Sequence, residues 1–314
     1  MTDKIFKTHD DLIVVLNSRG IIIETDEDIA FAKQVLSQIG YYNLINGYNK
    51  MFLESNDSNT DLYRSGTTLQ EIHALYQFDK KLRSIFMKYI LSVETHIKSL
   101  IAYYFSKEHG HKNYLTYNNF NTHVKNAHKQ IPDLIANIQN QTASRSSDPS
   151  IRHYLKEYGY IPLWVLNNIL TFGTISKFYS LMNTNERQSV SKQFGIQDNA
   201  LENFLFYLSG VRNFCAHDNR LYCYRTKWPI IDTKYHQDLQ IEQNESGEFL
   251  LGKRDLFASV IALKILLSKN DIKRMSKELY RNFGILYNKL DVLEKNEILN
   301  EMGFPYNWKY IERL

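Results

Sequence analysis

The chain has 314 residues, 43% of them hydrophobic, only 5 prolines and a formal net charge of +4. This composition excludes a disordered chain, and the length allows one large domain or two medium ones with a sizeable core. The mild positive charge permits nucleic-acid binding through a local patch without requiring it. Cys215 and Cys223 fit a reduced cytoplasmic protein better than a secreted disulfide scaffold. We expect no signal peptide and no membrane span, because residues 1–11 are polar and Lys264 interrupts the longest apolar run, 256–267.

Apolar residues recur at helical spacing along almost the whole chain, which predicts a mainly α fold. Acidic residues 26–28 after Thr25, and the capping box from Thr68 to Glu71, predict two of the helix starts. Alternation around Ser246-Gly247 predicts one small β-hairpin within residues 228–252. The expected helices cover residues 10–19, 25–40, 41–52, 68–107, 124–140, 150–158, 162–183, 186–194, 198–217, 254–268 and 271–290.

Turn-forming composition predicts where the chain divides. Residues 54–66 predict a boundary, and the polar stretch 141–150 predicts a mobile loop. We therefore expect an N-terminal helical segment over residues 1–60, a helical domain with inserted helices over 67–290, and a C-terminal tail over 291–314 packed on it. The chain has no Walker-type phosphate loop, dinucleotide fingerprint or Gly-x-Ser-x-Gly elbow, so several common enzyme classes are excluded.

The helix that begins after Thr68 carries three charges on its apolar stripe. With Ile72 as zero and about 100° per residue, Asp79 falls at about −20°, Arg83 at about +20° and Glu94 at about +40°. Asp79 and Arg83 are also four residues apart, which allows them to pair. Buried charges are costly, so this cluster either joins helices structurally or supports a functional site.

The segment from Val211 to Arg220 closes another apolar helix and contains Arg212, Asn213 and His217. An arginine binds phosphate through a planar, permanently charged fork, and a histidine transfers protons near neutral pH. These side chains suffice for cleaving an RNA phosphodiester bond without a metal ion. Arginine followed by histidine at such spacing also arises by chance, so the motif gains weight only from its position.

The helical wheel separates these residues. With Leu201 as zero, Arg212 falls at about +20° inside the apolar stripe, whereas Asn213 and His217 share another edge at about 120–160°. Arg212 and His217 reach one phosphate only if the helix ends there or if two copies of the motif face each other. This geometry favours a composite site across a homodimer.

Other polar residues allow a structural or an RNA-binding interpretation. No cysteine or carboxylate accompanies the loop histidines at zinc spacing, so we expect no metal site at residues 109, 111, 123 and 128. Lysines on the long helix, including Lys98, are predicted to form its solvated face and could steer RNA. The aromatic residues of 41–48 either pack in the core or stack on bases. The candidate RNA contacts are Lys80, Lys81, Arg220, Tyr41, Tyr42 and Tyr48.

Nine short blocks in the same order resemble the bacterial Abi-like abortive-infection family, which includes AbiD and AbiF. They are Arg19-Gly20, Ile39–Tyr48, Phe78–Arg83, Glu94, Ile161–Trp164, Thr171–Gly173, Arg212–His217, Met302–Pro305 and Trp308. The chain departs from related sequences at Asn43 and at Ile45-Asn46, where they often carry arginine and Ser-Gly-like residues.

The resemblance places the chain in the HEPN superfamily, whose signature is arginine followed four to six residues later by histidine. It implies a HEPN-type helical bundle with extra N-terminal and C-terminal helices. It also implies that the protein forms a homodimer and acts as a metal-independent endoribonuclease toxin in anti-phage defence. Members similar to AbiF imply control by a small noncoding RNA that acts as antitoxin. No cofactor is implied, and the expected partners are RNA and a second copy of the chain.

The implied chemistry assigns a role to each candidate. His217 would act as general acid or base, Arg212 would stabilise the phosphorane, and Asn213 would orient His217 or bind phosphate. The products would be a 2′,3′-cyclic phosphate and a 5′-hydroxyl, with Asp79, Arg83 and Glu94 supporting Arg212 from behind. Two alternatives stay open: a non-catalytic RNA-binding or dimerisation protein, and a toxin silenced by a partner nucleotidyltransferase.

Overall fold

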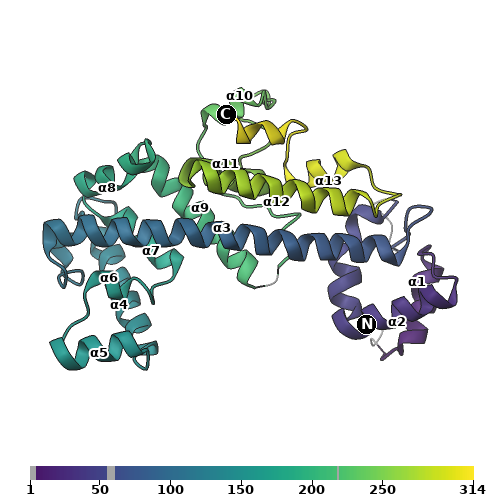
Figure 1. Cartoon of the computed structure of the whole chain (residues 1–314), viewed down its shortest axis with the longest axis horizontal. Helices are drawn as coiled ribbons and strands as arrows, with labels where there is room; N and C mark the ends of the chain where they lie inside the picture. The colour runs from purple at the N-terminus through teal and green to yellow at the C-terminus, as the bar shows by residue number, and fades with distance from the viewer. Residues whose placement is uncertain (1–4, 55–60, 218) are drawn as a thin grey trace.

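The computed structural model describes residues 5–54, 61–217 and 219–314, and it confirms the mainly α fold. One helix, α3 (Leu69–His109), has 41 residues and runs along the length of the molecule (Figure 1). At 1.5 Å per residue, this helix is about 60 Å long. The predicted capping box starts it, since the Thr68 side chain accepts from the Glu71 backbone and Glu71 accepts from the Thr68 backbone. A single long helix thus connects both ends of the molecule.

Three other helices pack against the middle of α3. They bury α3's apolar face, which includes Phe86 and Ile90. Helix α12 (Lys269–Tyr287) lies alongside α3, and α9 (Asp198–Ala216) crosses it (Figure 1). The third helix is α11 (Leu256–Leu266).

Smaller helices cover the two ends of α3 (Figure 1). At one end lie α1 (His9–Ser18), α2 (Asp26–Ile39), a π-helical turn (Tyr42–Asn46) and a 3₁₀ turn (Lys50–Phe52). At the other end lie α4 (Ala127–Ser144), α5 (Pro149–Tyr158), α6 (Leu163–Leu166), α7 (Phe172–Leu181) and α8 (Thr184–Ser191). The second group, α4 to α8, lies between 3₁₀ turns at Tyr117–Asn119 and Lys192–Phe194. Both groups contribute buried side chains to the core.

The C-terminal residues form structure of their own. After α10 (Lys234–Asp238), the chain ends with α13 (Lys295–Met302) and a 3₁₀ helix (Trp308–Glu312). Phe304 and Trp308 are buried against Phe283 of α12, with ring centroids 5.7 and 5.4 Å from it. The expected tail is therefore an integral layer of the core.

Several sequence expectations are wrong in detail. Residues 141–144 continue α4 and 149–150 begin α5, so the predicted mobile loop shrinks to a turn at 145–148. The expected helix over 162–183 is two helices, because Thr171 caps α7 and the chain turns before it.

The predicted hairpin within 228–252 is present only in minimal form, since no extended strand occurs in the described ranges. An isolated antiparallel bridge joins Gln243 and Phe249, and Asn244 N–H donates to Glu248 O at 2.9 Å. Residues 55–60 of the predicted boundary lie outside the described residues. The domain limits at 60, 67 and 290 stay predictions. No described helix has the length and apolarity needed to cross a membrane.

Candidate functional site

The end of α9 presents the three candidate catalytic residues in different surroundings. The Arg212 side chain is 30% exposed, whereas Asn213 and His217 are exposed to solvent. His217 follows the last residue of α9, and its backbone N–H donates to Asn213 O at 3.2 Å. The histidine thus sits where the helix stops and the chain turns away, which leaves its ring accessible.

Arg212 faces Glu94 on α3. Its Nε lies 3.8 Å from Glu94 Oε2, an ion-pair distance that is too long for a hydrogen bond. The other Glu94 oxygen pairs with Lys98 Nζ at 2.7 Å. Glu94 therefore lies between two cations. Lys98, which was predicted on the solvated face, has a side chain only 15% exposed and belongs to this cluster.

Asp79 and Arg83 contact the segment that follows His217 rather than Arg212. Asp79 Oδ2 accepts from Arg83 Nη1 at 2.5 Å and from the buried Tyr48 hydroxyl at 2.8 Å. The same carboxylate accepts the backbone N–H groups of Leu221 at 3.2 Å and Tyr222 at 2.7 Å. A buried charge pair of α3 thus binds the backbone four to five residues after the candidate catalytic histidine.

The electrostatics of Asp79 reflect these contacts. Burial raises the pKa of Asp79 to about 6, while the Arg83 guanidinium, the Tyr48 hydroxyl and the two backbone amides each lower it. All four neighbours donate hydrogen bonds to the carboxylate, so the ionised form is the one that they bind. Burial likewise raises the pKa of the nearby Cys215 thiol to about 12, which argues against a nucleophilic cysteine here.

Arg83 also binds the backbone of the segment that follows His217. Its Nη1 donates to the backbone oxygen of Asn219 at 3.2 Å. Arg220 extends this connection, since its Nη1 donates to the carbonyl oxygens of Asn46 at 3.2 Å and Gly47 at 3.0 Å. The π-helical turn, α3 and the segment after α9 are therefore tied together around His217.

A polar groove of about 490 Å³ lies where these three segments meet. His217, Arg83 and Arg220 line it together with Tyr42 and Tyr48, so two guanidinium groups and the histidine border one cavity. The remaining lining residues are Gln38, Ile39, Asn43, Asn46, Gly47, Tyr76 and Asn219. A negatively charged ligand would find cations and a proton-transfer group in this groove. We call it the His217 groove.

The candidate RNA contacts divide into two groups. Tyr42 is exposed at the His217 groove, and Arg220 lines it, whereas Tyr48 lines it with a buried ring whose hydroxyl is bound to Asp79. Tyr41 points elsewhere, because its hydroxyl accepts from Arg19 Nη1 at 3.1 Å. Lys80 and Lys81 are exposed on α3 and do not line the groove.

Arg212 does not line the His217 groove either. It lies beside Glu94 on the other face of α9, which agrees with the divergence expected from the helical wheel. Sequence reasoning missed the amides at Gln38 and Asn46 and the ring of Tyr76, and no spacing signal could have found them, because their elements meet only in the tertiary structure. Among the described residues, no group of three or more His, Cys, Asp or Glu side chains is placed to hold a metal ion.

Comparison with known proteins gives one match. Residues 34–223 match the family model described as Abi-like protein, a range that spans more than half of the chain and contains every candidate catalytic and supporting residue. The blocks at 19–20 and 302–308 lie outside it. No curated protein and no solved structure matches the chain significantly.

Proposed function

The chain belongs to the Abi-like protein family, which points to abortive infection, and from this premise we propose that it is an endoribonuclease toxin of the HEPN type. The proposed reaction needs no metal ion. It requires Arg212, Asn213 and His217, and it cleaves RNA to a 2′,3′-cyclic phosphate and a 5′-hydroxyl.

One observation carries the proposal: the buried Asp79–Arg83 pair binds the backbone of residues 219–222, shortly after His217. A charge pair with 0% and 6% of its side chains exposed is an expensive way to fill a core, and an apolar pair would serve packing as well. Here the pair binds backbone groups of Asn219, Leu221 and Tyr222. The free-energy cost of burying these charges is explained if the position of His217 is needed for function.

The proposed mechanism uses the side chains as follows. His217 takes the proton from the ribose 2′-hydroxyl, whose oxygen attacks the adjacent phosphorus, or it donates a proton to the departing 5′-oxygen. The Arg212 guanidinium stabilises the extra negative charge on the phosphorane, a role that requires a fixed donor. Glu94, held in turn by Lys98, restrains Arg212 on its Nε side. Asn213 orients His217 or donates to the phosphate.

The two main groups face different surfaces of one protomer, which favours a site shared by two copies. His217 borders its groove, and Arg212 lies at Glu94 on the other side of α9. In the proposed homodimer, Arg212 of one copy and His217 of the other approach the same phosphate. A small noncoding RNA that occupies the shared site would hold the toxin inactive.

Inducible expression in a bacterial host tests the proposal. Wild type should arrest growth, and the purified protein should cleave RNA to fragments with cyclic phosphate ends in the presence of EDTA. Arg212→Ala and His217→Ala should lose both effects. Arg281→Ala and His153→Ala are matched controls, because both residues are exposed on other helices, and they should remain toxic. If the Arg212 and His217 variants stay as toxic as wild type, the nuclease assignment fails.

Nucleic acid that copurifies with the His217→Ala protein tests the regulatory part. A single defined small RNA supports an RNA antitoxin, and protein free of RNA argues against it. Wild-type protein that binds RNA but does not cleave it would favour the non-catalytic alternative. Covalent nucleotidylation detected by intact mass would favour silencing by a partner nucleotidyltransferase.

A further inference from the structure

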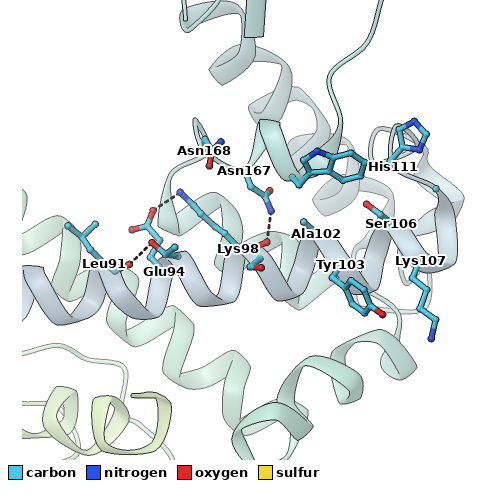
Figure 2. Close-up of a pocket in the computed structure, with 14 residues that line it drawn as sticks. Leu91, Glu94, Lys98, Ala102, Tyr103, Ser106, Lys107, His111, Asn167 and Asn168 are labelled. Carbon is cyan, nitrogen blue, oxygen red and sulfur yellow. Dashed lines mark hydrogen bonds and ion pairs between the residues drawn. The ribbon is translucent and has the colours of Figure 1, made fainter. Parts of the chain in front are cut away.

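A second and larger cavity, of about 950 Å³, lies along α3 on the side that faces α6 (Figure 2). It extends over four turns of α3, from Leu91 and Glu94 to Lys107, and is closed by His111 and by Asn167 and Asn168 beyond α6. We call it the α3–α6 groove. Glu94 is common to this groove and to the ion pair with Arg212, so the groove begins beside a candidate catalytic residue.

The walls of the α3–α6 groove carry exposed aromatic rings. The Trp164 side chain is 52% exposed and that of Tyr103 is 64% exposed, although both line the cavity. The Trp164 ring is braced by His111, with centroids 5.7 Å apart. The His111 ring nitrogen is in turn within 3.0 Å of the Tyr160 hydroxyl. These contacts restrain Trp164, and about half of this residue remains exposed to a ligand.

The floor of the groove contains buried polar atoms that lack a partner. Asn167 is 2% exposed, and its Nδ2 donates to Lys98 O at 2.7 Å (Figure 2). Its Oδ1 is buried and accepts no hydrogen bond within the described part of the chain, and the same holds for Ser106 Oγ. A buried carbonyl oxygen without a donor is costly, so a ligand that brings an N–H group to Asn167 would be bound favourably.

The charges of the groove are arranged along its length. Lys98 is neutralised by Glu94 at one end, whereas Lys107 is exposed at the other. The cavity therefore offers an aromatic ring, an acceptor that has no donor among the described residues, and an exposed cation at its outer end. A flat ring with N–H donors attached to an anionic backbone satisfies all three. An apolar protein segment would leave the Asn167 oxygen without a donor.

We propose that the α3–α6 groove binds an unpaired nucleotide of single-stranded RNA next to the cleavage site. The base stacks on Trp164 and donates an amino hydrogen to Asn167 Oδ1, and a flanking phosphate contacts Lys107. The inference rests on the proposed function, since it names the part of the substrate that this site holds. Amino-bearing bases are preferred, because their exocyclic amino group extends beyond the ring, whereas the only base donor of uracil is its ring N3–H.

Fluorescence anisotropy with the full-length His217→Ala protein tests the proposal without cleavage. Short oligocytidine should bind more tightly than oligouridine of equal length. Trp164→Ala should weaken binding of oligocytidine about tenfold, the usual size of one lost stacking contact. Trp228→Ala is the matched control, because Trp228 is 54% exposed and lines neither groove, and it should change the affinity less than about twofold. Lys107→Ala should reduce the salt dependence of binding.

Two results would overturn the inference. They are unchanged RNA affinity in Trp164→Ala and equal binding of oligocytidine and oligouridine. If the affinity is unchanged and the oligomeric state of Trp164→Ala differs from wild type, a second copy of the chain covers the groove. Circular dichroism of the variant confirms that it is folded, as expected for an exposed side chain.

Cleavage by wild type separates this inference from the proposed function. If RNA is cleaved with dependence on Arg212 and His217 while Trp164→Ala binds normally, the function stands and the groove assignment fails. If Trp164→Ala weakens binding while wild type cleaves nothing, the groove stands and the nuclease fails. If both hold, Trp164→Ala should raise KM and leave kcat nearly unchanged.

Discussion

Asp79 shows at the scale of one residue how the core and the site are connected. Its carboxylate is fully buried and receives donors from α3, from Tyr48 just beyond the π-helical turn, and from the segment after α9. Removing one partner of a buried pair leaves the other charge without compensation, which is more damaging than never having built the pair.

We expect Asp79→Ala to lower the free energy of unfolding by about 3–5 kcal/mol, because Arg83, two backbone amides and the Tyr48 hydroxyl lose their acceptor. Urea unfolding followed by circular dichroism measures this loss. Asp10→Ala is the control, since it breaks an exposed pair with Lys33 and should cost less than about 1 kcal/mol. Equal losses in the two variants would show that the Asp79 cluster does not stabilise the fold.

The sequence predicted part of this arrangement. Helical periodicity places Asp79, Arg83 and Glu94 on the buried stripe of α3, and all three are at most 5% exposed. It could not identify their partners, because Tyr48 and Tyr222 lie 31 and 143 residues from Asp79 along the chain. Spacing within one helix carries no information about such contacts. The three charges were therefore assigned together to Arg212, although only Glu94 contacts it.

At the scale of elements, the C-terminal layer depends on a close approach between two helix ends. Gly303 terminates α13 with a φ of +75°, a conformation that side chains disfavour. A Cβ atom at this position would overlap the side chain of Asp255. That carboxylate caps α11 by accepting from Ala258 N at 3.1 Å and also accepts from Gly252 N at 2.8 Å. The start of α11 and the end of α13 thus fit together only without a side chain at residue 303.

Gly303→Ala should therefore destabilise the protein by about 4 kcal/mol, from backbone strain together with the displaced Asp255 hydrogen bonds. Gly159→Ala is the control, because Gly159 has a similar φ of +74° with open space around it, so only the strain of about 1 kcal/mol applies. Thermal unfolding of both variants measures the difference. A Gly303 variant as stable as the Gly159 variant would contradict the tight fit.

The accuracy of the predicted elements follows from the strength of their local signals. The acidic residues after Thr25 and the capping box at Thr68 correctly predicted the starts of α2 and α3. Polar composition suggested a loop at 141–150, but α4 needs only a narrow apolar face, and Ile138 and Thr142 continue its helical turns. The packing of residues 291–314 on the helical domain was predicted, but α13 was not identified within them, because it has only 8 residues. Local patterns predict long capped helices well and tertiary docking poorly.

At the scale of the whole molecule, α9 separates Arg212 and His217 onto two faces, and this separation leads to the last prediction. Each homodimer of Arg212→Ala or of His217→Ala should be inactive. When the two variants are unfolded, mixed in equal amounts and refolded, about half of the dimers should contain one copy of each. In such a dimer, one shared site has both of its defective residues and the other has an intact arginine and an intact histidine.

Mixing should therefore restore roughly a quarter of wild-type RNA cleavage, because half of the dimers carry one working site of two. Coexpression of the two variants with different affinity tags, followed by tandem purification, enriches the mixed dimer and should raise the recovery to about one half. Arg212→Ala mixed with the double variant Arg212→Ala/His217→Ala serves as control, since no dimer of that mixture has an intact arginine, and it should stay inactive. If the mixed dimer stays inactive while sedimentation shows that it forms, both groups act within one chain, and the end of α9 must rearrange to bring them to the same phosphate.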